Sequence, residues 1–256
     1  MLTAACGGSG PGEGRDGAAA ASPAAPSQRI RSQCHEAGDV EHRLTRKDGG
    51  QTFAVSVGSG SRAVVLMPMH GADHCSWMPF ARMIARQSGV QAWAVDSVGS
   101  AGESFATSAD LRLVDDVVTA VDEARGQGAT AVSLAGASMG GTTVLGAATR
   151  VGADRLVSLS APWAYGGVDA LVAAKRLDIP ALIIVGEQDE PDFVDSAHRL
   201  VRAIPDGAGE YVGIVSSGHG TDLLGEEVRG RFLMDVLADY LTAPNATAVL
   251  SIEPAP

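Results

Sequence analysis

The fold is decided by the stretch Val132-Ser133-Leu134-Ala135-Gly136-Ala137-Ser138-Met139-Gly140-Gly141. A run of β-formers ends there in Gly-x-Ser-x-Gly, and a small-residue helical pattern follows directly. A strand, a sharp turn and a helix in this order are the context of a nucleophile elbow. The turn strains its serine, and the flanking glycines lack the Cβ that would keep strand and helix apart. The Ser138 hydroxyl would then lie near the positive end of a helix and its free N–H groups.

The motif alone has low specificity. Glycine accounts for 32 of the 256 residues, so Gly-x-Ser-x-Gly can occur by chance. A glycine-rich turn without a catalytic role is therefore an alternative interpretation of this stretch. The rest of the chain has to decide between the two.

The composition narrows the class of protein. A net charge of −11 argues against nucleic-acid binding and against electrostatic attachment to an anionic membrane. No uninterrupted apolar run reaches the ~20 residues of a transmembrane helix. Aromatic residues make up only 4% of the chain, so the core must be built from Val, Leu, Ile and Ala.

Strand and helix patterns alternate along most of the chain. Residues 40–45 and 52–57 alternate around Asp48-Gly49, which predicts a hairpin. Further strands are predicted at 63–67, 90–96, 132–137, 155–159, 181–185 and 211–215. Helices are predicted at 77–87, 111–125, 141–150, 168–176, 192–203 and 223–240. This alternation predicts an α/β fold with a mostly parallel, eight-stranded sheet, helices on both faces and an antiparallel hairpin at one edge.

The two ends of the chain differ from this pattern. Residues 1–28 are mainly Ala, Gly, Ser and Pro, which predicts a disordered leader, followed by one domain over 29–242 and a flexible tail over 243–256. The residues around Cys6 resemble the lipobox and tether of a bacterial lipoprotein, although the charged and apolar parts of a signal peptide are missing. We expect an exported or cell-surface protein, with membrane attachment only through lipidation of Cys6. If Cys6 is incidental, the protein is cytoplasmic.

Three predicted strand ends carry catalytic side chains. Ser138 follows the central strand, Asp189 follows the strand at 181–185, and His219 follows the strand at 211–215. Ligands bind beyond the carboxyl ends of the strands in an open α/β sheet, so these residues should meet. His219 would accept the proton of Ser138, and Asp189 would orient the imidazole. The alternative is that Asp189 and His219 are ordinary solvated loop residues.

The order Ser, Asp, His resembles that of the α/β-hydrolase superfamily, and the resemblance covers about Val40 to Tyr240. The segment 96–104 resembles the Asp-x-x-Gly-x-Gly-x-Ser loop of that family with one extra residue. The segments 71–77 and 158–162 are similar to actinobacterial, lipoprotein-like members of the dienelactone hydrolase-related group. True dienelactone hydrolases use a Cys nucleophile, so Ser138 favours ester hydrolysis over lactone opening.

An oxyanion hole needs two donors directed at the developing negative charge. The backbone N–H of Met139 is the first predicted donor. His70-Gly71 resembles the His-Gly element of the family, which makes the N–H of Ala72 the second. His70, Asp73 and His74 could instead be interpreted as a metal site, but their spacing lacks a strong precedent, so no metal is expected.

Two cysteines remain once Cys6 is set aside as a lipid-anchor residue. Cys34 precedes the first strand and Cys75 opens the first helix. If the protein is exported, we expect a Cys34–Cys75 disulfide. The alternative is a pair of reduced cysteines.

The interval from Ser138 to Asp189 is fully used by predicted helices and strands, which leaves no room for a cap domain. The pocket should therefore be open, with His70, Trp163 and Tyr165 as residues of its wall; Trp163 and Tyr165 could equally be ordinary surface aromatics. We expect a cofactor-free serine hydrolase that cleaves a small-molecule or polymer ester. The alternatives are an acyltransferase or thioesterase with the same triad, or a catalytically silent binding protein of this fold.

Overall fold

The computed structural model describes residues 34–87, 89–96, 112–225 and 228–243. The predicted leader with Cys6, residues 97–104 of the family-like loop and the tail beyond residue 243 lie outside these ranges. In the part of the chain that is described, no helix combines the length and apolarity needed to cross a membrane.

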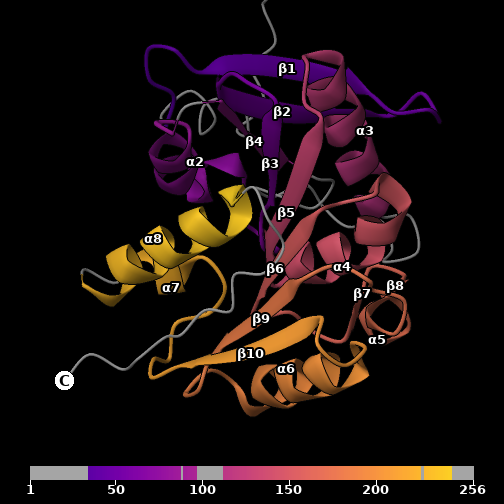
Figure 1. Cartoon of the computed structure of the whole chain (residues 1–256), viewed down its shortest axis with the longest axis vertical. Coiled ribbons are helices and arrows are strands. Elements are labelled where there is room, and N and C mark those ends of the chain that lie inside the picture. The colour runs from indigo at the N-terminus through magenta and orange to yellow at the C-terminus, as the bar shows by residue number, and fades with distance from the viewer. Residues whose placement is uncertain (1–33, 88, 97–111, 226–227, 244–256) are drawn as a thin grey trace, which may run out of the picture.

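The core of the molecule is the predicted eight-stranded sheet (Figure 1). Its spatial order is β1-β2-β4-β3-β5-β6-β9-β10. The strands β1 and β2 form an antiparallel hairpin, β2 is antiparallel to β4, and all other neighbours are parallel. The fold class is therefore confirmed, including the antiparallel hairpin at one edge. The bounds are β1 Val40–Thr45, β2 Gln51–Gly58, β3 Arg62–Met67, β4 Val90–Asp96, β5 Ala131–Ala137, β6 Arg155–Leu159, β9 Ala181–Gly186 and β10 Gly209–Ile214.

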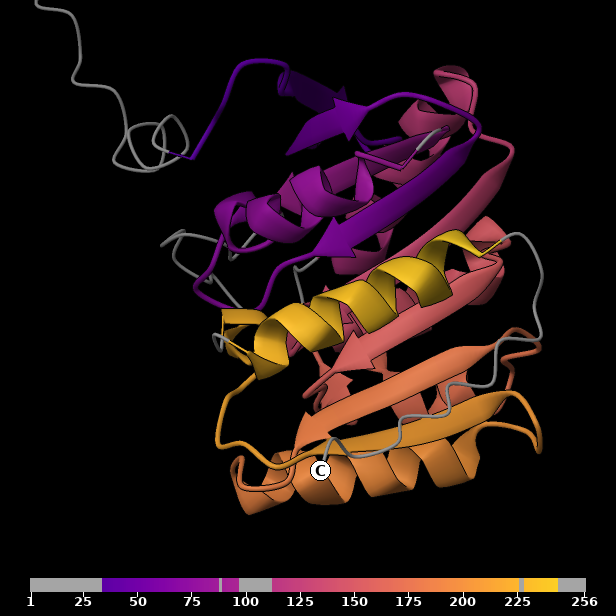
Figure 2. The ribbon, with the colours of Figure 1, turned by 60° about the vertical axis from the view of Figure 1, so that its left-hand side comes forward.

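Helices cover both faces of the sheet. Strand side chains alternate between the faces, so in β3 Val64 and Leu66 enter one apolar cluster and Val65 and Met67 enter the other. The first cluster packs under α2 and α8, which lie in front of the sheet in Figure 2, and the second packs under α3, α4 and α6. The bounds are η1 His74–Ser76, α2 Met78–Ile84, α3 Leu113–Gly126, α4 Met139–Val151, α5 Ala170–Ala174, α6 Pro191–Ala203, α7 Asp222–Gly225 and α8 Arg229–Thr242.

Two predicted helices differ in the structure. The helix expected at 168–176 is preceded by a small hairpin, β7 Ala164–Tyr165 and β8 Val168–Asp169, and α5 begins only at Ala170. Gly166 and Gly167 both have positive φ and form the turn, and Asp169 then caps α5 through the Val172 N–H. The helix expected at 223–240 is two helices, α7 and α8. Their close contact needs Gly230, because a Cβ there would lie 2.5 Å from the Leu224 carbonyl.

The segment before β1 is tied to the first helical region. Cys34 and Cys75 form the expected disulfide. Arg82 of α2 donates to the Cys34 carbonyl and pairs with Asp39 at 2.6 Å. Burial alone would raise the pKa of Asp39, but hydrogen bonds from Arg82 and from the Glu36 N–H lower it overall. These contacts anchor the chain entering the hairpin.

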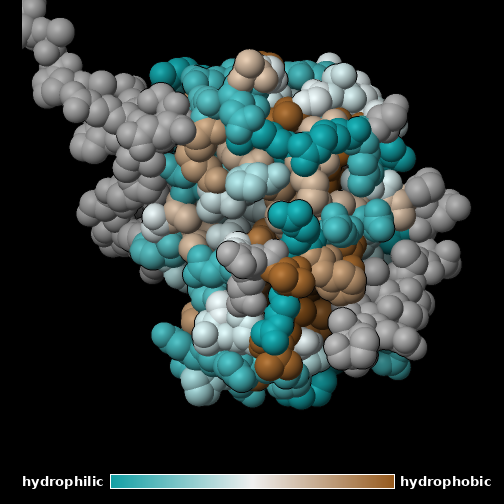
Figure 3. All heavy atoms as spheres, turned by 90° about the vertical axis from the view of Figure 1, so that its left-hand side faces the viewer, coloured by the Kyte–Doolittle hydropathy of each residue, from teal (hydrophilic) through white to brown (hydrophobic). Residues whose placement is uncertain are grey.

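The side of the molecule with α2, α7 and α8 is viewed in Figure 3. Hydrophilic side chains cover much of it, and apolar atoms gather in its lower half. Among the described residues, large exposed apolar side chains near α7 and α8 include Val215, which directly follows β10, and Val228 and Phe232. The loop that carries His219 therefore runs next to exposed apolar surface.

Candidate active site

Ser138 lies between β5 and α4, as the motif predicts. Its φ of 50° and ψ of −115° are strained values for a residue with a side chain, and it is 9% exposed. A Cβ on Gly136 would lie 2.2 Å from the Gly140 carbonyl oxygen, and one on Gly140 would lie 2.3 Å from that of Met67. The two glycines are thus needed for the close approach of strand, turn and helix.

The turn is fixed by its own backbone. The Ser138 N–H donates to the Leu159 carbonyl at 2.7 Å, and the Ser138 carbonyl accepts the Thr142 N–H at 3.1 Å. Met139 is the first residue of α4, so its N–H belongs to the group that has no carbonyl partner within a helix. The positive end of α4 is therefore next to the Ser138 side chain.

Asp189 and His219 are brought together by the ends of β9 and β10. The distance from His219 Nδ1 to Asp189 Oδ2 is 2.8 Å, and the other carboxylate oxygen accepts the Glu190 N–H at 2.8 Å. The Asp189 side chain is 4% exposed and that of His219 26%. An ionised carboxylate only accepts, so His219 donates from Nδ1, and the neutral form of this imidazole has its lone pair on Nε2.

The His219 loop lies against the elbow. A Cβ on Gly220, the next residue, would lie 3.2 Å from the Ala137 Cβ and 3.8 Å from the Ser138 N. The same loop also packs against the end of β9, because a Cβ on Gly186 would lie 2.7 Å from the carbonyl oxygens of Ser216 and Gly218. Ser138, Asp189 and His219, which are far apart in sequence, therefore lie at one edge of the sheet.

The loop after β3 differs in detail from the sequence prediction. The N–H of Ala72, the expected second oxyanion donor, donates to the Met69 carbonyl at 3.2 Å and closes a turn. The residues of this segment that contact the elbow precede Ala72 in the sequence. Gly140 of the elbow packs against the carbonyl oxygens of Met67 and Pro68. Met69 follows, and its sulfur would lie 3.3 Å from a Cβ on Gly220. Met69 therefore approaches the glycine of the His219 loop that packs against the elbow.

His70 and Tyr165, two of the expected wall residues, are in contact. The Tyr165 hydroxyl lies 3.0 Å from His70 Nδ1 and joins the loop after β3 to the β7–β8 hairpin. Burial raises the pKa of Tyr165, which keeps the phenol neutral at ordinary pH. This pair bridges two loops that follow β3 and β6.

Trp163, the third expected wall residue, is 44% exposed. The Arg199 guanidinium lies 5.1 Å from the centre of its ring. This contact joins Trp163 to α6. A role in the wall therefore stays a prediction.

Sequence reasoning missed Phe193. Its ring centre lies 4.2 Å from that of His219, at an angle of 51°. Phe193 is in the first turn of α6, four residues after Asp189, so the chain segment that supplies the carboxylate also supplies a ring against the imidazole. No local pattern indicates this contact, because it depends on how α6 meets the His219 loop.

The predicted alternative metal cluster is not assembled. His70 pairs with Tyr165, whereas His74 is fully buried and bonds to Asp96. Groups with metal-ligand spacing among the described residues are Cys34, His35 and His74, and Asp73, His74 and Cys75. Neither group contains His70.

Solved structures of similar fold include several hydrolases. An esterase from Pyrococcus furiosus matches with a TM-score of 0.65 at 13% identity, over 79% of this chain and 91% of the esterase. A monoacylglycerol lipase from Paleococcus ferrophilus matches with a TM-score of 0.62 at 16% identity, over 75% and 98%. A dienelactone hydrolase from Anabaena variabilis matches with a TM-score of 0.62 at 19% identity, over 79% and 97%. The chain therefore has the α/β-hydrolase fold.

The sequence comparisons add no closer relative. No family model matches the chain, and no curated protein matches it at a significant level. Function must therefore be argued from the site.

Proposed function

We propose that this protein is a serine hydrolase that cleaves carboxylic esters through an acyl-enzyme intermediate. The observation that carries the proposal is the buried Asp189 carboxylate bonded to His219 Nδ1 at 2.8 Å, in a loop packed against the strained Ser138. A carboxylate, an imidazole and a strained serine at one sheet edge are the parts that acyl transfer requires.

The reaction follows from these groups. The Nε2 lone pair of His219 accepts the Ser138 proton as the serine oxygen attacks the ester carbonyl carbon. Asp189 stabilises the imidazolium that forms, and His219 then protonates the departing alcohol. Water, activated by the same imidazole, attacks the acyl-enzyme, and the carboxylic acid leaves as Ser138 regains its proton.

Negative charge on the tetrahedral intermediate needs N–H donors. The N–H of Met139, at the start of α4, is the first donor we assign. For the second donor we now favour the N–H of Met69, because the Ala72 N–H already serves a turn and Met69 approaches Gly220. The exposed Val215 beside the His219 loop offers apolar surface for an acyl chain.

Two other functions were considered for a chain with this fold and these residues. A thioesterase or acyltransferase would keep the triad and change only the leaving group or acceptor. A silent binding protein would not need Ser138, Asp189 and His219 at one edge of the sheet, which is why we favour an enzyme. We also propose that the protein is exported, since a Cys34–Cys75 disulfide is typical of oxidising compartments.

The test is hydrolysis of p-nitrophenyl esters from acetate to palmitate. We expect the wild type to hydrolyse at least one ester and Ser138→Ala to lose roughly 10³-fold or more in kcat/KM. Ser160→Ala is the matched control, since Ser160 is also buried with a positive φ of 47°. Wild-type inactivity on every ester, or an equally active Ser138→Ala protein, would remove the esterase proposal.

A further inference from the structure

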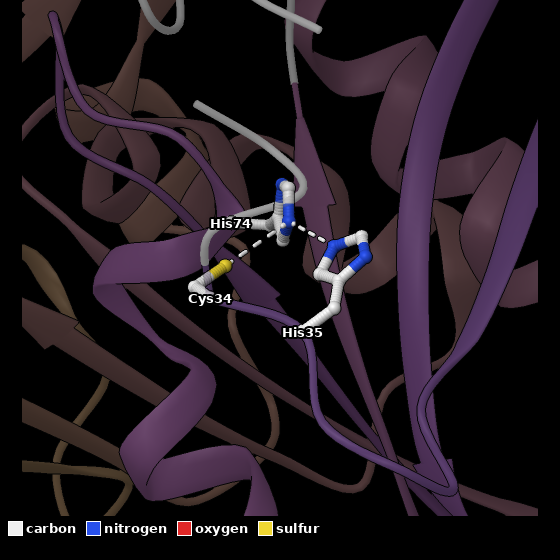
Figure 4. Close-up of side chains that lie close together, drawn as sticks. All are labelled: Cys34, His35 and His74. Carbon is white, nitrogen blue, oxygen red and sulfur yellow. Dashed lines mark hydrogen bonds between the residues drawn. The ribbon is translucent and has the colours of Figure 1, made fainter. Parts of the chain in front are cut away.

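A second cluster of reactive side chains lies away from the proposed active site. Cys34 and His35 precede β1, and His74 and Cys75 belong to η1 after the β3 loop. Figure 4 shows Cys34, His35 and His74 with their side chains directed toward one another. His74 is fully buried, at 0% exposure, and Cys34 and Cys75 are joined as a disulfide.

The donor atoms of this cluster meet at His74 Nε2. His74 Nε2 lies 2.9 Å from His35 Nε2 and 3.6 Å from each of the Cys34 and Cys75 sulfurs. The ligand atoms of Cys34, His35 and His74 all lie within 4.8 Å of one another. Two sulfurs and two imidazole nitrogens are the donor set of many structural zinc sites.

Both imidazoles are oriented for a metal. His74 Nδ1 is 3.0 Å from Asp96 Oδ1, and His35 Nδ1 is 2.8 Å from Glu41 Oε1. A carboxylate accepts the Nδ1 proton in each pair, so the two Nε2 atoms face each other, and either a proton or a metal ion between them would satisfy both. A carboxylate behind each ligating histidine is the usual second shell of a zinc site.

The charge around the cluster also favours a cation. Asp73 is 6% exposed, and its Oδ2 has no hydrogen-bond partner among the described residues. Its carboxylate lies in one group with His74 and Cys75, with ligand atoms within 4.8 Å of one another. A buried carboxylate oxygen without a donor is costly unless positive charge lies close to it.

The distances from His74 Nε2 to the two sulfurs fit a tetrahedral ion. Zinc bonds of about 2.3 Å to sulfur and about 2.0 Å to nitrogen put neighbouring S and N ligands about 3.6 Å apart. That is the distance from His74 Nε2 to both sulfurs. The two nitrogens need to be about 3.3 Å apart and the two sulfurs about 3.8 Å. Zinc binding therefore requires the two bonded sulfurs to separate and the two nitrogens, now 2.9 Å apart, to move slightly further from each other.

We propose that the reduced protein binds one zinc ion through Cys34, His35, His74 and Cys75, and that disulfide formation and zinc binding exclude each other. A phosphine or dithiol reductant supplies two electrons to the S–S bond, and each sulfur takes up a proton. Zn²⁺ then displaces both thiol protons as the two Zn–S bonds form. An oxidant that removes two electrons from the thiolates restores the S–S bond and releases Zn²⁺.

The experiment uses the full chain and zinc chloride. One sample is reduced anaerobically with a phosphine and the other keeps its disulfide; both are loaded, desalted and analysed for zinc by mass spectrometry. We expect about one zinc per chain in the reduced protein and less than about a tenth of that in the oxidised protein. Diamide, which is itself reduced to the hydrazine, should release the zinc.

Variants locate the ion. His35→Ala removes one ligand at a half-buried position and should lower retained zinc at least about tenfold. His198→Ala is the matched control, because His198 stacks on Tyr211 of β10, away from the cluster. In case His35→Ala folds poorly, Co²⁺ in the reduced wild type provides an independent measurement, with the visible bands of a tetrahedral thiolate site expected.

Three results would overturn the proposal: no zinc on the reduced wild type, equal zinc on the reduced and oxidised proteins, or equal zinc on His35→Ala and His198→Ala. The proposal does not rest on esterase activity. Ser138→Ala should bind zinc as the wild type does, so failure of one proposal can be told from failure of the other.

Discussion

Two histidine–carboxylate pairs in this molecule have nearly the same geometry and different surroundings. His219 and Asp189 are 2.8 Å apart at the carboxyl ends of β9 and β10, with the imidazole 26% exposed. His74 and Asp96 are 3.0 Å apart, with the imidazole fully buried. In both pairs the carboxylate holds Nδ1 and leaves Nε2 for another partner.

What faces Nε2 decides the role of each pair. The His219 loop packs against a strained serine, so we assign that imidazole as a base. The Nε2 of His74 faces His35 and two cysteine sulfurs, so we assign it as a ligand. A histidine–carboxylate contact alone is therefore weak evidence for catalysis, and the first three predictions below test the assignment of the two roles.

The largest difference in kcat/KM is expected between the variants His219→Gln and His74→Gln. The first should lower kcat/KM for the best ester by about 10³-fold or more, because no base remains to accept the Ser138 proton. The second should leave kcat/KM within about threefold and reduce the free energy of unfolding by about 1–3 kcal/mol, since a buried hydrogen-bonded group is lost. Steady-state kinetics and urea unfolding measure both. A comparable loss of rate in both variants would contradict the assignment.

The carboxylates of the two pairs should show the same contrast between an effect on rate and an effect on stability. Asp189→Asn should lower kcat by about 10³–10⁴-fold, because the amide holds the imidazole in the wrong tautomer and cannot stabilise the imidazolium. Asp96→Asn should affect thermal stability more than rate. If Asp189→Asn kept wild-type kcat while folded by circular dichroism, Asp189 would not be the orienting residue.

The aromatic neighbours of the two histidines should give a smaller difference in rate. The Phe193 ring lies 4.2 Å from His219, and the Phe53 ring lies 5.4 Å from His74. Phe193→Ala should lower kcat/KM about tenfold and shift the pH–rate profile, because the imidazole loses the ring that positions it. Phe53→Ala should cost about 3–5 kcal/mol of stability, since Phe53 is buried. Phe193→Leu, which restores bulk, should recover part of the rate; an unchanged pH profile in Phe193→Ala would argue for packing alone.

The smallest effect is expected on stability, from the Asp39–Arg82 ion pair that holds the chain segment before β1. Hydrogen bonds from Arg82 and the Glu36 N–H outweigh burial and lower the pKa of Asp39. Its stabilising contribution is therefore present above the unfolded-state pKa and is lost as the pH falls through the lower folded-state pKa. At pH 7, Asp39→Asn should reduce the free energy of unfolding by about 1 kcal/mol, which lowers the melting temperature by a few degrees. The loss of stability should become progressively smaller as the pH falls. A stability difference that is independent of pH would contradict this role.

Local patterns were sufficient for much of the fold. The elbow, the hairpin at β1 and β2 and the mostly parallel eight-stranded sheet follow from runs of apolar residues and glycines, whereas the spatial order of the strands was not predicted. The β7–β8 hairpin was missed because its strands have two residues each, too few to show a period. The single helix expected at 223–240 was wrong because the contact at Gly230 is tertiary.

The residues of the proposed site were indicated by the sequence to a similar degree. Chain order and strand ends indicated Ser138, Asp189 and His219, because parallel strands bring their carboxyl ends together. The contact of Phe193 with His219, and the use of the Ala72 N–H in a turn, depend on how loops pack in three dimensions. The His35–His74 contact likewise joins residues 39 apart in sequence.

The most direct test of the central claim is labelling with a fluorophosphonate, which reacts with an activated serine, followed by peptide mass spectrometry. We predict one adduct on Ser138, absent in Ser138→Ala, strongly slowed in His219→Gln and retained in His74→Gln. Absence of any adduct on the folded wild type, or an adduct on a different serine, would contradict the assignment of this site as a serine hydrolase centre.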